Sequence, residues 1–62
     1  MSMRQNEFVL ELRRAGCSLK RYGSKHDVYE NESAGKQATI PKAPVLASTL
    51  CKEIRKQLGL KS

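Results

Sequence analysis

Apolar residues recur at helical spacing near the beginning of the chain. They fall every three or four positions, at Phe8, Val9, Leu12 and Ala15. This period predicts a helix over about residues 4–15 that turns one face to a core. Ser2 followed by Gln5 fits a capping box at its start. Gly16 follows the last apolar position, where a left-handed residue commonly ends a helix.

A second helix is predicted at the other end of the chain. Its apolar stripe consists of Leu50, Cys51, Ile54 and Leu58. Ser48 can cap this helix at its start. Gly59 would end it, with Leu60 folding back onto the last turn as in a Schellman motif.

The residues between the two helices alternate with a period of two, which is typical of strands. We expect strands at residues 17–22, 26–31 and 36–40. Gly23 and Ser24 signal a turn between the first two, and a hairpin loop over 31–35 joins the second to the third. The first strand would place Cys17, Leu19 and Arg21 on one face and Ser18, Lys20 and Tyr22 on the other. The second would place His26, Val28 and Glu30 on one face and Asp27, Tyr29 and Asn31 on the other.

Prolines separate these strands from the final helix. Pro41 ends the third strand, and the connector 41–44, which also holds Pro44, can neither extend a ladder nor enter a helix interior. The predicted order is helix, three antiparallel strands, helix, which is an α+β fold in one domain over residues 1–62. Both helices can cover one face of the three-stranded sheet and leave the other face open to solvent.

The charge balance favours a polyanionic partner. The 62 residues include 12 Lys and Arg against 6 Asp and Glu, which gives a net charge of +6. In so short a chain this balance indicates nucleic acid as the partner. Two alternatives stay open, namely charge that serves solubility and a basic face that docks an acidic protein. A chain of this length has little room for a deep pocket, so we expect its chemistry on an exposed face.

The two cysteines and the N-terminal residues indicate the compartment. Cys17 and Cys51 are far apart in sequence, and neither belongs to a CxxC pair. The first residues contain no apolar leader segment, and no stretch is long and apolar enough to span a membrane. We therefore expect a cytoplasmic protein with reduced thiols. Two Cys and one His are too few ligands for a metal site, so we expect no metal and no other cofactor.

His26, the only histidine, ends the run Gly23–Ser24–Lys25–His26. An imidazole gives or takes a proton near neutral pH without a large change of its pKa. RNA carries its own nucleophile, the 2′-hydroxyl, so its cleavage needs a base for that hydroxyl, an acid for the 5′-oxygen and cations for the phosphate charge. His26 beside Lys25 could supply much of this. A lone histidine near a turn is more often an ordinary surface residue, so its spacing alone gives weak support for catalysis.

Basic and aromatic side chains gather around the predicted strands. The candidates for phosphate contacts are Lys20, Arg21, Lys25, Lys36 and Lys42. A base could stack on Tyr22 or Tyr29, although a strand tyrosine is more often half-buried, and Tyr22 is favoured because it adjoins the turn. Ser24 could donate to a phosphate oxygen, or it could stabilise the turn. Alternatively, these cations simply face solvent and bind nothing. We expect this for the cations on the predicted helices, Arg13, Arg14, Lys52, Arg55 and Lys56.

The ordered set of segments resembles the HicA family, also called YcfA-like, which comprises the small toxins of HicA and HicB toxin–antitoxin pairs. The matching segments are LELRRAG at residues 10–16, YGSKH at 22–26 followed by DVY, TIPK at 39–42 and LCKEIRKQLGL at 50–60. Each segment is short, but together they occur in the family's order and span most of the chain, from residue 10 to residue 60.

The resemblance implies a fold like the double-stranded RNA-binding domain and an endoribonuclease that cleaves mRNA without a metal. His26 would be its catalytic residue, with Gly23 and Ser24 forming the turn before it. A HicB antitoxin would be the partner that blocks the active face. Many family members carry a second His where Lys25 stands, and Arg-His-Pro near the connector 41–44. Without these groups, either His26 serves as base and acid in turn, or Lys25, Tyr22 or water fills one role.

Two further hypotheses come from other functional classes. A non-catalytic double-stranded RNA-binding module usually carries a basic run at the start of its last helix, whereas residues 45–50 contain no Lys. A basic protein-interaction domain would use the same charges to bind an acidic partner. RNA cleavage would distinguish a toxin nuclease from both, and salt-dependent duplex binding without cleavage would favour the first of these alternatives.

Overall fold

The computed structural model describes residues 1–60, in which eight short elements follow one another. They are β1 (Ser2–Arg4), α1 (Gln5–Arg14), β2 (Cys17–Arg21), β3 (His26–Asn31), the 3₁₀ helix η1 (Glu32–Ala34), β4 (Lys36–Pro41), β5 (Val45–Ala47) and α2 (Ser48–Gln57). Both predicted helices and all three predicted strands are therefore present, with ends that differ from the expected ones by about one residue.

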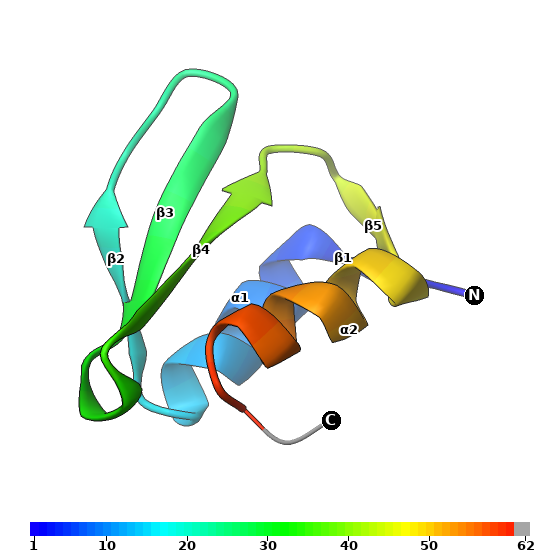
Figure 1. The fold of residues 1–62 in the computed structure, drawn as a ribbon. Helices are drawn as coiled ribbons and strands as arrows, with labels where there is room; N and C mark the ends of the chain where they lie inside the picture. Colours follow the sequence, from blue (N-terminus) through cyan, green and yellow to red (C-terminus); the bar gives the residue numbers. More distant parts are fainter. Residues whose placement is uncertain (61–62) are drawn as a thin grey trace.

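The strands β2, β3 and β4 form one antiparallel sheet in that order. The helix α1 packs against β2, and α2 packs against β4. Both helices thus lie on the same side of the sheet (Figure 1). The α+β arrangement of two helices on one face of a three-stranded antiparallel sheet is confirmed.

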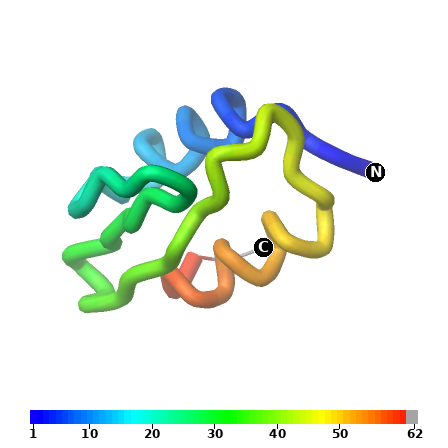
Figure 2. The backbone as a smooth tube through the Cα atoms, turned by 90° about the horizontal axis from the view of Figure 1, so that it is seen from above, coloured from blue at the N-terminus to red at the C-terminus, as the bar shows by residue number. Residues whose placement is uncertain are grey.

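One hydrophobic core fills the space between the helices and the sheet. Its buried residues are Phe8, Leu12, Cys17, Tyr29, Ala38, Ile40, Leu46, Cys51, Ile54 and Leu58. Seen from above, α1 and α2 line two sides of this core, and the three-stranded sheet lies along a third (Figure 2). Each large apolar side chain buried here stabilises the fold by about 1.5–3 kcal/mol. Cys17 and Cys51 are unbonded, and burial raises the pKa of each thiol.

A second, two-stranded sheet was not expected from the sequence. In it β1 pairs with β5, and Met3 lies opposite Leu46. Each strand runs directly into a helix, and because the pairing is antiparallel, α1 and α2 begin at opposite ends of this small sheet. Strands of three residues are too short to show a period, and this pair joins distant parts of the chain.

This small sheet replaces the predicted side-chain caps of both helices. The residues before the helices are Arg4 and Ala47, and neither makes a side-chain cap bond. Backbone carbonyls accept from the first amide of each helix instead. The bonds run from Gln5 N–H to the Pro44 carbonyl and from Ser48 N–H to the Met1 carbonyl, each at 3.0 Å. The capping roles predicted for Ser2 and Ser48 are therefore wrong, because the paired strands already satisfy these amides.

The strand β2 does not alternate evenly, because it contains a bulge. The register pairs Leu19 with Tyr29 and Arg21 with Val28. Lys20 is thus an additional residue, and such an insertion changes the direction of the side chains that follow it. Arg21 therefore shares the face of Val28. The prediction that Arg21 faces the same way as Cys17 is wrong, as is the extension of this strand to Tyr22.

The C-terminal end of α2 has the predicted Schellman geometry. Gly59 adopts a φ of 74°, and its N–H donates to the Lys56 carbonyl at 3.0 Å. The N–H of Leu60 donates to the Arg55 carbonyl at 2.8 Å. These two bonds satisfy carbonyls that the helix itself leaves without partners.

An ion pair joins the two helices. The Arg55 guanidinium donates to the Glu11 carboxylate from two nitrogens, at 2.6 Å and 2.9 Å, and lies 5.2 Å from the Phe8 ring centroid. Hydrogen bonding from Arg55 lowers the pKa of Glu11. The expectation that Arg55 simply faces solvent is therefore wrong, because its planar fork matches a carboxylate on the neighbouring helix.

Candidate functional site

The strand β3 has one buried and one open face, as its alternation predicts. Asp27, Tyr29 and Asn31 are buried, whereas His26 is exposed and lies opposite Pro41 of β4. Because His26 is the first residue of β3, its imidazole stands at one end of the sheet. A polymer can reach it there without entering the fold.

The turn before His26 requires glycine at position 23. A Cβ on Gly23 would collide with the backbone carbonyl oxygen of His26. The backbone of Gly23 therefore approaches that of His26 closely, which makes the turn tight. Ser24 and Lys25 are exposed between these two residues.

Asp27 holds this turn from the inside. The Gly23 N–H donates to Asp27 Oδ1 at 3.2 Å, and the Lys42 ammonium lies 3.3 Å from the same oxygen. The side chain of Asp27 is only 10% exposed. A carboxylate buried this far is tolerated when a cation and a hydrogen bond compensate it, and Asp27 has both.

Lys42 holds the turn from the outside as well. Its backbone N–H donates to the Lys25 carbonyl at 3.0 Å, and its ammonium lies 3.2 Å from the centroid of the Tyr22 ring. Desolvation acts to lower the pKa of Lys42, but its contacts with Tyr22 and Asp27 outweigh that effect and leave the pKa above its ordinary value. The ammonium therefore stays charged at neutral pH and keeps its contacts with Asp27 and Tyr22.

A shallow depression of about 410 Å³ lies where this turn meets the start of α1. It is lined by Gln5, Tyr22, Asp27, Lys42, Ala43 and Pro44. Tyr22 is 76% exposed at its rim. The depression thus combines an open aromatic ring, an internal ion pair and an apolar connector.

Two more cations lie on the open side of the sheet, Arg21 opposite Val28 near the His26 end and Lys20 with its ammonium at Glu30 toward the other end. Lys20 and Arg21 are both exposed, and the Lys20 ammonium lies 3.3 Å from Glu30 Oε2. An exposed pair of this kind contributes about 0–1 kcal/mol. Lys20 can therefore exchange Glu30 for a phosphate at little loss.

The structure does not bring every expected contact residue to His26. Lys36 pairs with Asn31 at the far end of the hairpin, five residues along the strand and hence about 17 Å away. Its side chain runs past Gly59. Tyr29 is 4% exposed, so its ring belongs to the core and offers no surface for a base. His26, Lys25, Ser24, Tyr22 and Lys42 do gather at one end.

Two residues of this site escaped sequence reasoning, namely Asp27 and Gln5. Asp27 lies on the same face of β3 as Tyr29 and Asn31, and a carboxylate on a core-facing position signals a buried partner. That signal was available in the sequence. Gln5 lies at the start of α1, and its place beside Tyr22 depends on the unpredicted pairing of β1 with β5.

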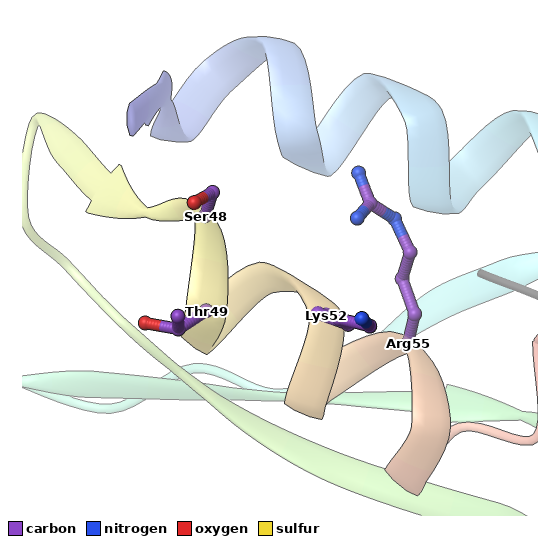
Figure 3. A pocket seen from close by; sticks show the side chains of 4 residues that line it. All are labelled: Ser48, Thr49, Lys52 and Arg55. Atoms are coloured by element: carbon purple, nitrogen blue, oxygen red, sulfur yellow. The ribbon is translucent and has the colours of Figure 1, made fainter. Parts of the chain in front are cut away.

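A second depression, of about 500 Å³, lies at the start of α2 and is lined by Ser48, Thr49, Lys52 and Arg55. Figure 3 shows the Arg55 side chain projecting from α2 toward α1. Its charge is already matched by Glu11. This depression contains no residue of the turn that carries His26.

The comparisons with known proteins do not place the chain in a family. No family model, no curated protein and no solved structure that was compared with the chain matches it. Among residues 1–60, no helix is long and apolar enough to cross a membrane. Within that same range, no three His, Cys, Asp or Glu side chains are grouped closely enough to hold a metal ion.

Proposed function

We propose that this chain is the toxin of a toxin–antitoxin pair, a cytoplasmic endoribonuclease of the HicA type that cleaves mRNA and is neutralised by a HicB-type antitoxin. The observation that carries the proposal is the position of His26. It is an exposed imidazole at the end of an open sheet face, on a turn fixed by Gly23 and Asp27. The proposed relationship to the double-stranded RNA-binding domain is consistent with two helices over a three-stranded antiparallel sheet.

The proposed reaction uses the nucleophile that RNA already carries. A base removes the 2′-hydroxyl proton, and the 2′-oxygen attacks the adjacent phosphorus. The bond between phosphorus and the 5′-oxygen breaks, and an acid gives a proton to that oxygen. The products are a 2′,3′-cyclic phosphate and a free 5′-hydroxyl. His26 carries out one of these proton transfers or both in turn. Lys25, Tyr22 or water supplies the second group where His26 does not, and the proposal includes no metal.

Phosphate binding in this proposal falls to cations that are free to move. Arg21 and Lys25 are exposed near the turn, and Lys20 is exposed further along the open face, where its ammonium contacts Glu30. Cations at a phosphate stabilise the charge that develops during cleavage. Lys42 has a different role, because Asp27 and Tyr22 already engage its ammonium. It positions the turn that carries His26. Lys36 lies at the other end of the sheet and would contact only a longer RNA.

An antitoxin partner fits the same surface. The net charge of +6 favours an acidic protein, and a protein laid over the open face of the sheet would cover His26 together with Lys20 and Arg21. Binding there excludes RNA by occupying the cations and by blocking access to the imidazole. The partner in this proposal therefore acts by competition for one face.

Expression in bacteria tests this proposal directly. We expect the wild-type chain to arrest growth and to fragment cellular mRNA, and His26→Ala to do neither while reaching the same soluble level. Coexpression of a HicB-type protein from the neighbouring reading frame should restore growth. Intact mRNA with the wild-type chain, or equal fragmentation by the Ala variant, contradicts the proposal. Salt-dependent RNA binding without cleavage would instead favour a non-catalytic RNA-binding module.

A further inference from the structure

We propose that the depression bordered by Tyr22, Asp27 and Lys42 binds one unpaired nucleobase, with the Tyr22 ring as its stacking platform. RNA as the ligand rests on the proposed function. The inference adds a substrate class to it, because a base that enters this depression must come from single-stranded RNA. It also gives Tyr22 a binding role that does not depend on proton transfer.

The Tyr22 ring is both exposed and held in place. Its exposed fraction is 76%, so much of its surface is accessible for stacking. The Lys42 ammonium, 3.2 Å from the ring centroid, covers one face of the ring and fixes its orientation, so the base stacks on the opposite face. A platform that is already ordered loses little conformational entropy when a base stacks on it.

Charge in the depression favours a base over a phosphate. The Asp27 carboxylate lies 3.3 Å from the Lys42 ammonium, so the two charges largely cancel. A phosphate brought here would meet a carboxylate and a cation that is already paired. A nucleobase carries no net charge, has a planar face for Tyr22 and presents polar edges that suit Gln5 and Asp27.

Size and placement agree with a single base. Pockets that bind small ligands enclose about 300–1,000 Å³, and this depression of about 410 Å³ lies at the lower end of that range. Ala43 and Pro44 give it an apolar wall. Tyr22 precedes the Gly23 turn and His26 follows it, so a base held on Tyr22 places a nearby phosphate beside His26. In a duplex the bases stay stacked on one another and cannot enter.

Binding of short oligonucleotides to a non-cleaving protein tests the inference. The parent is the full chain with His26→Ala, and the probes are fluorescein-labelled deca-adenylate and a ten-base-pair RNA duplex, measured by anisotropy. Loss of one stacked base costs about 10- to 100-fold in affinity. We expect Tyr22→Leu to weaken deca-adenylate binding by roughly that factor and to leave duplex binding unchanged. Tyr22→Phe should bind like the parent, because it keeps the ring.

Leu10→Ala is the matched control, since Leu10 is also an exposed apolar residue but lies on α1 outside the depression. It should bind deca-adenylate like the parent. Equal affinities of the Tyr22→Leu variant and the parent for deca-adenylate would overturn the inference, as would equal losses for single strand and duplex. Tyr22-dependent binding of polyglutamate without any oligonucleotide binding would overturn it in favour of an acidic protein. If Tyr22-dependent RNA binding is found but the protein that retains His26 cleaves nothing, the proposed function fails while the base site stands.

Discussion

The two ends of β3 each bury a polar side chain on the same face, but they use it differently. At one end Asn31 donates from Nδ2 to the Leu58 carbonyl at 2.8 Å, and its Oδ1 accepts from the Ser33 hydroxyl at 2.9 Å. At the other end Asp27 accepts from the Gly23 N–H and pairs with Lys42. Asn31 carries a neutral amide that binds the sheet to the end of α2, whereas Asp27 carries a charged carboxylate.

This difference separates a structural end of the sheet from a candidate functional end. The contacts of Asn31 are made within the fold, and they satisfy a carbonyl at the end of a helix. The contacts of Asp27 fix a turn whose other residues are exposed, among them His26, Lys25 and Tyr22. Changes at the Asn31 end should therefore lower the free energy of unfolding, whereas changes at the Asp27 end should lower RNA cleavage.

Among the changes that test this comparison, the largest effect should come from Gly23→Ala. The added methyl group collides with the His26 carbonyl, so the turn must shift, and a displacement of about 1 Å can lower a reaction rate by about 100-fold. We expect a loss of that order in cleavage per folded molecule. Gly35→Asn at the other end is the control, because Asn tolerates the φ of 64° there. Equal cleavage by both variants would contradict the comparison.

Asn31→Ala should have the next largest effect. It should lower the free energy of unfolding and leave the cleavage rate unchanged. It leaves the Leu58 carbonyl without its side-chain donor, which costs about 1–3 kcal/mol in the free energy of unfolding. In a domain of this size each kcal/mol lowers Tm by about 4–8 °C. Thermal unfolding followed by circular dichroism measures this, and the cleavage rate below the transition should match wild type. A large loss of rate at that temperature would show that the two ends are not independent.

Lys42→Met and Lys36→Met form a matched pair that removes one ammonium from each end. Lys42→Met frees the Tyr22 ring and leaves Asp27 without its cation, so we expect cleavage to fall by about 10-fold through misplacement of the turn. Lys36→Met should reduce it by less than about 2-fold on a short RNA, since loss of one distant phosphate contact weakens binding only slightly. Initial rates on a ten-nucleotide substrate compare them. Equal losses would remove the distinction between the two lysines.

The smallest effect concerns the ion pair between the helices, which is remote from the His26 turn. Hydrogen bonding from Arg55 lowers the pKa of Glu11 below 4.5. The pair therefore stabilises the fold above that pH and loses its contribution as the pH falls through the lowered pKa. Because the Glu11 side chain is 40% exposed, we expect no more than about 1 kcal/mol. Urea unfolding should show that wild type is more stable than Glu11→Gln at pH 7 and that this difference shrinks as the pH falls below 4.5. A difference that does not change with pH would contradict this.

The sequence predicted the parts of this fold that repeat with a regular period. The alternation over 26–31 gave the bounds of β3 and the faces of His26 and Asp27, because one side of that strand is buried. It could not give β1 and β5, whose three-residue segments pair across the whole chain, nor the bulge at Lys20. The turn with Gly23 was recognised from its residues, but the roles of Asp27 and Lys42 were not. Those roles depend on contacts between the turn and the connector, which no local pattern encodes.

The proposed transfer of a proton by His26 during RNA cleavage can be tested directly by one measurement. Purified wild-type protein and His26→Ala, checked for equal Tm, are incubated with a short labelled RNA, and the products are resolved for a 2′,3′-cyclic phosphate. We expect the wild type to form that product and the Ala variant to be slower by about 100- to 10,000-fold, as loss of a general acid or base requires. Equal rates, or no cleavage by the wild type, would contradict the claim.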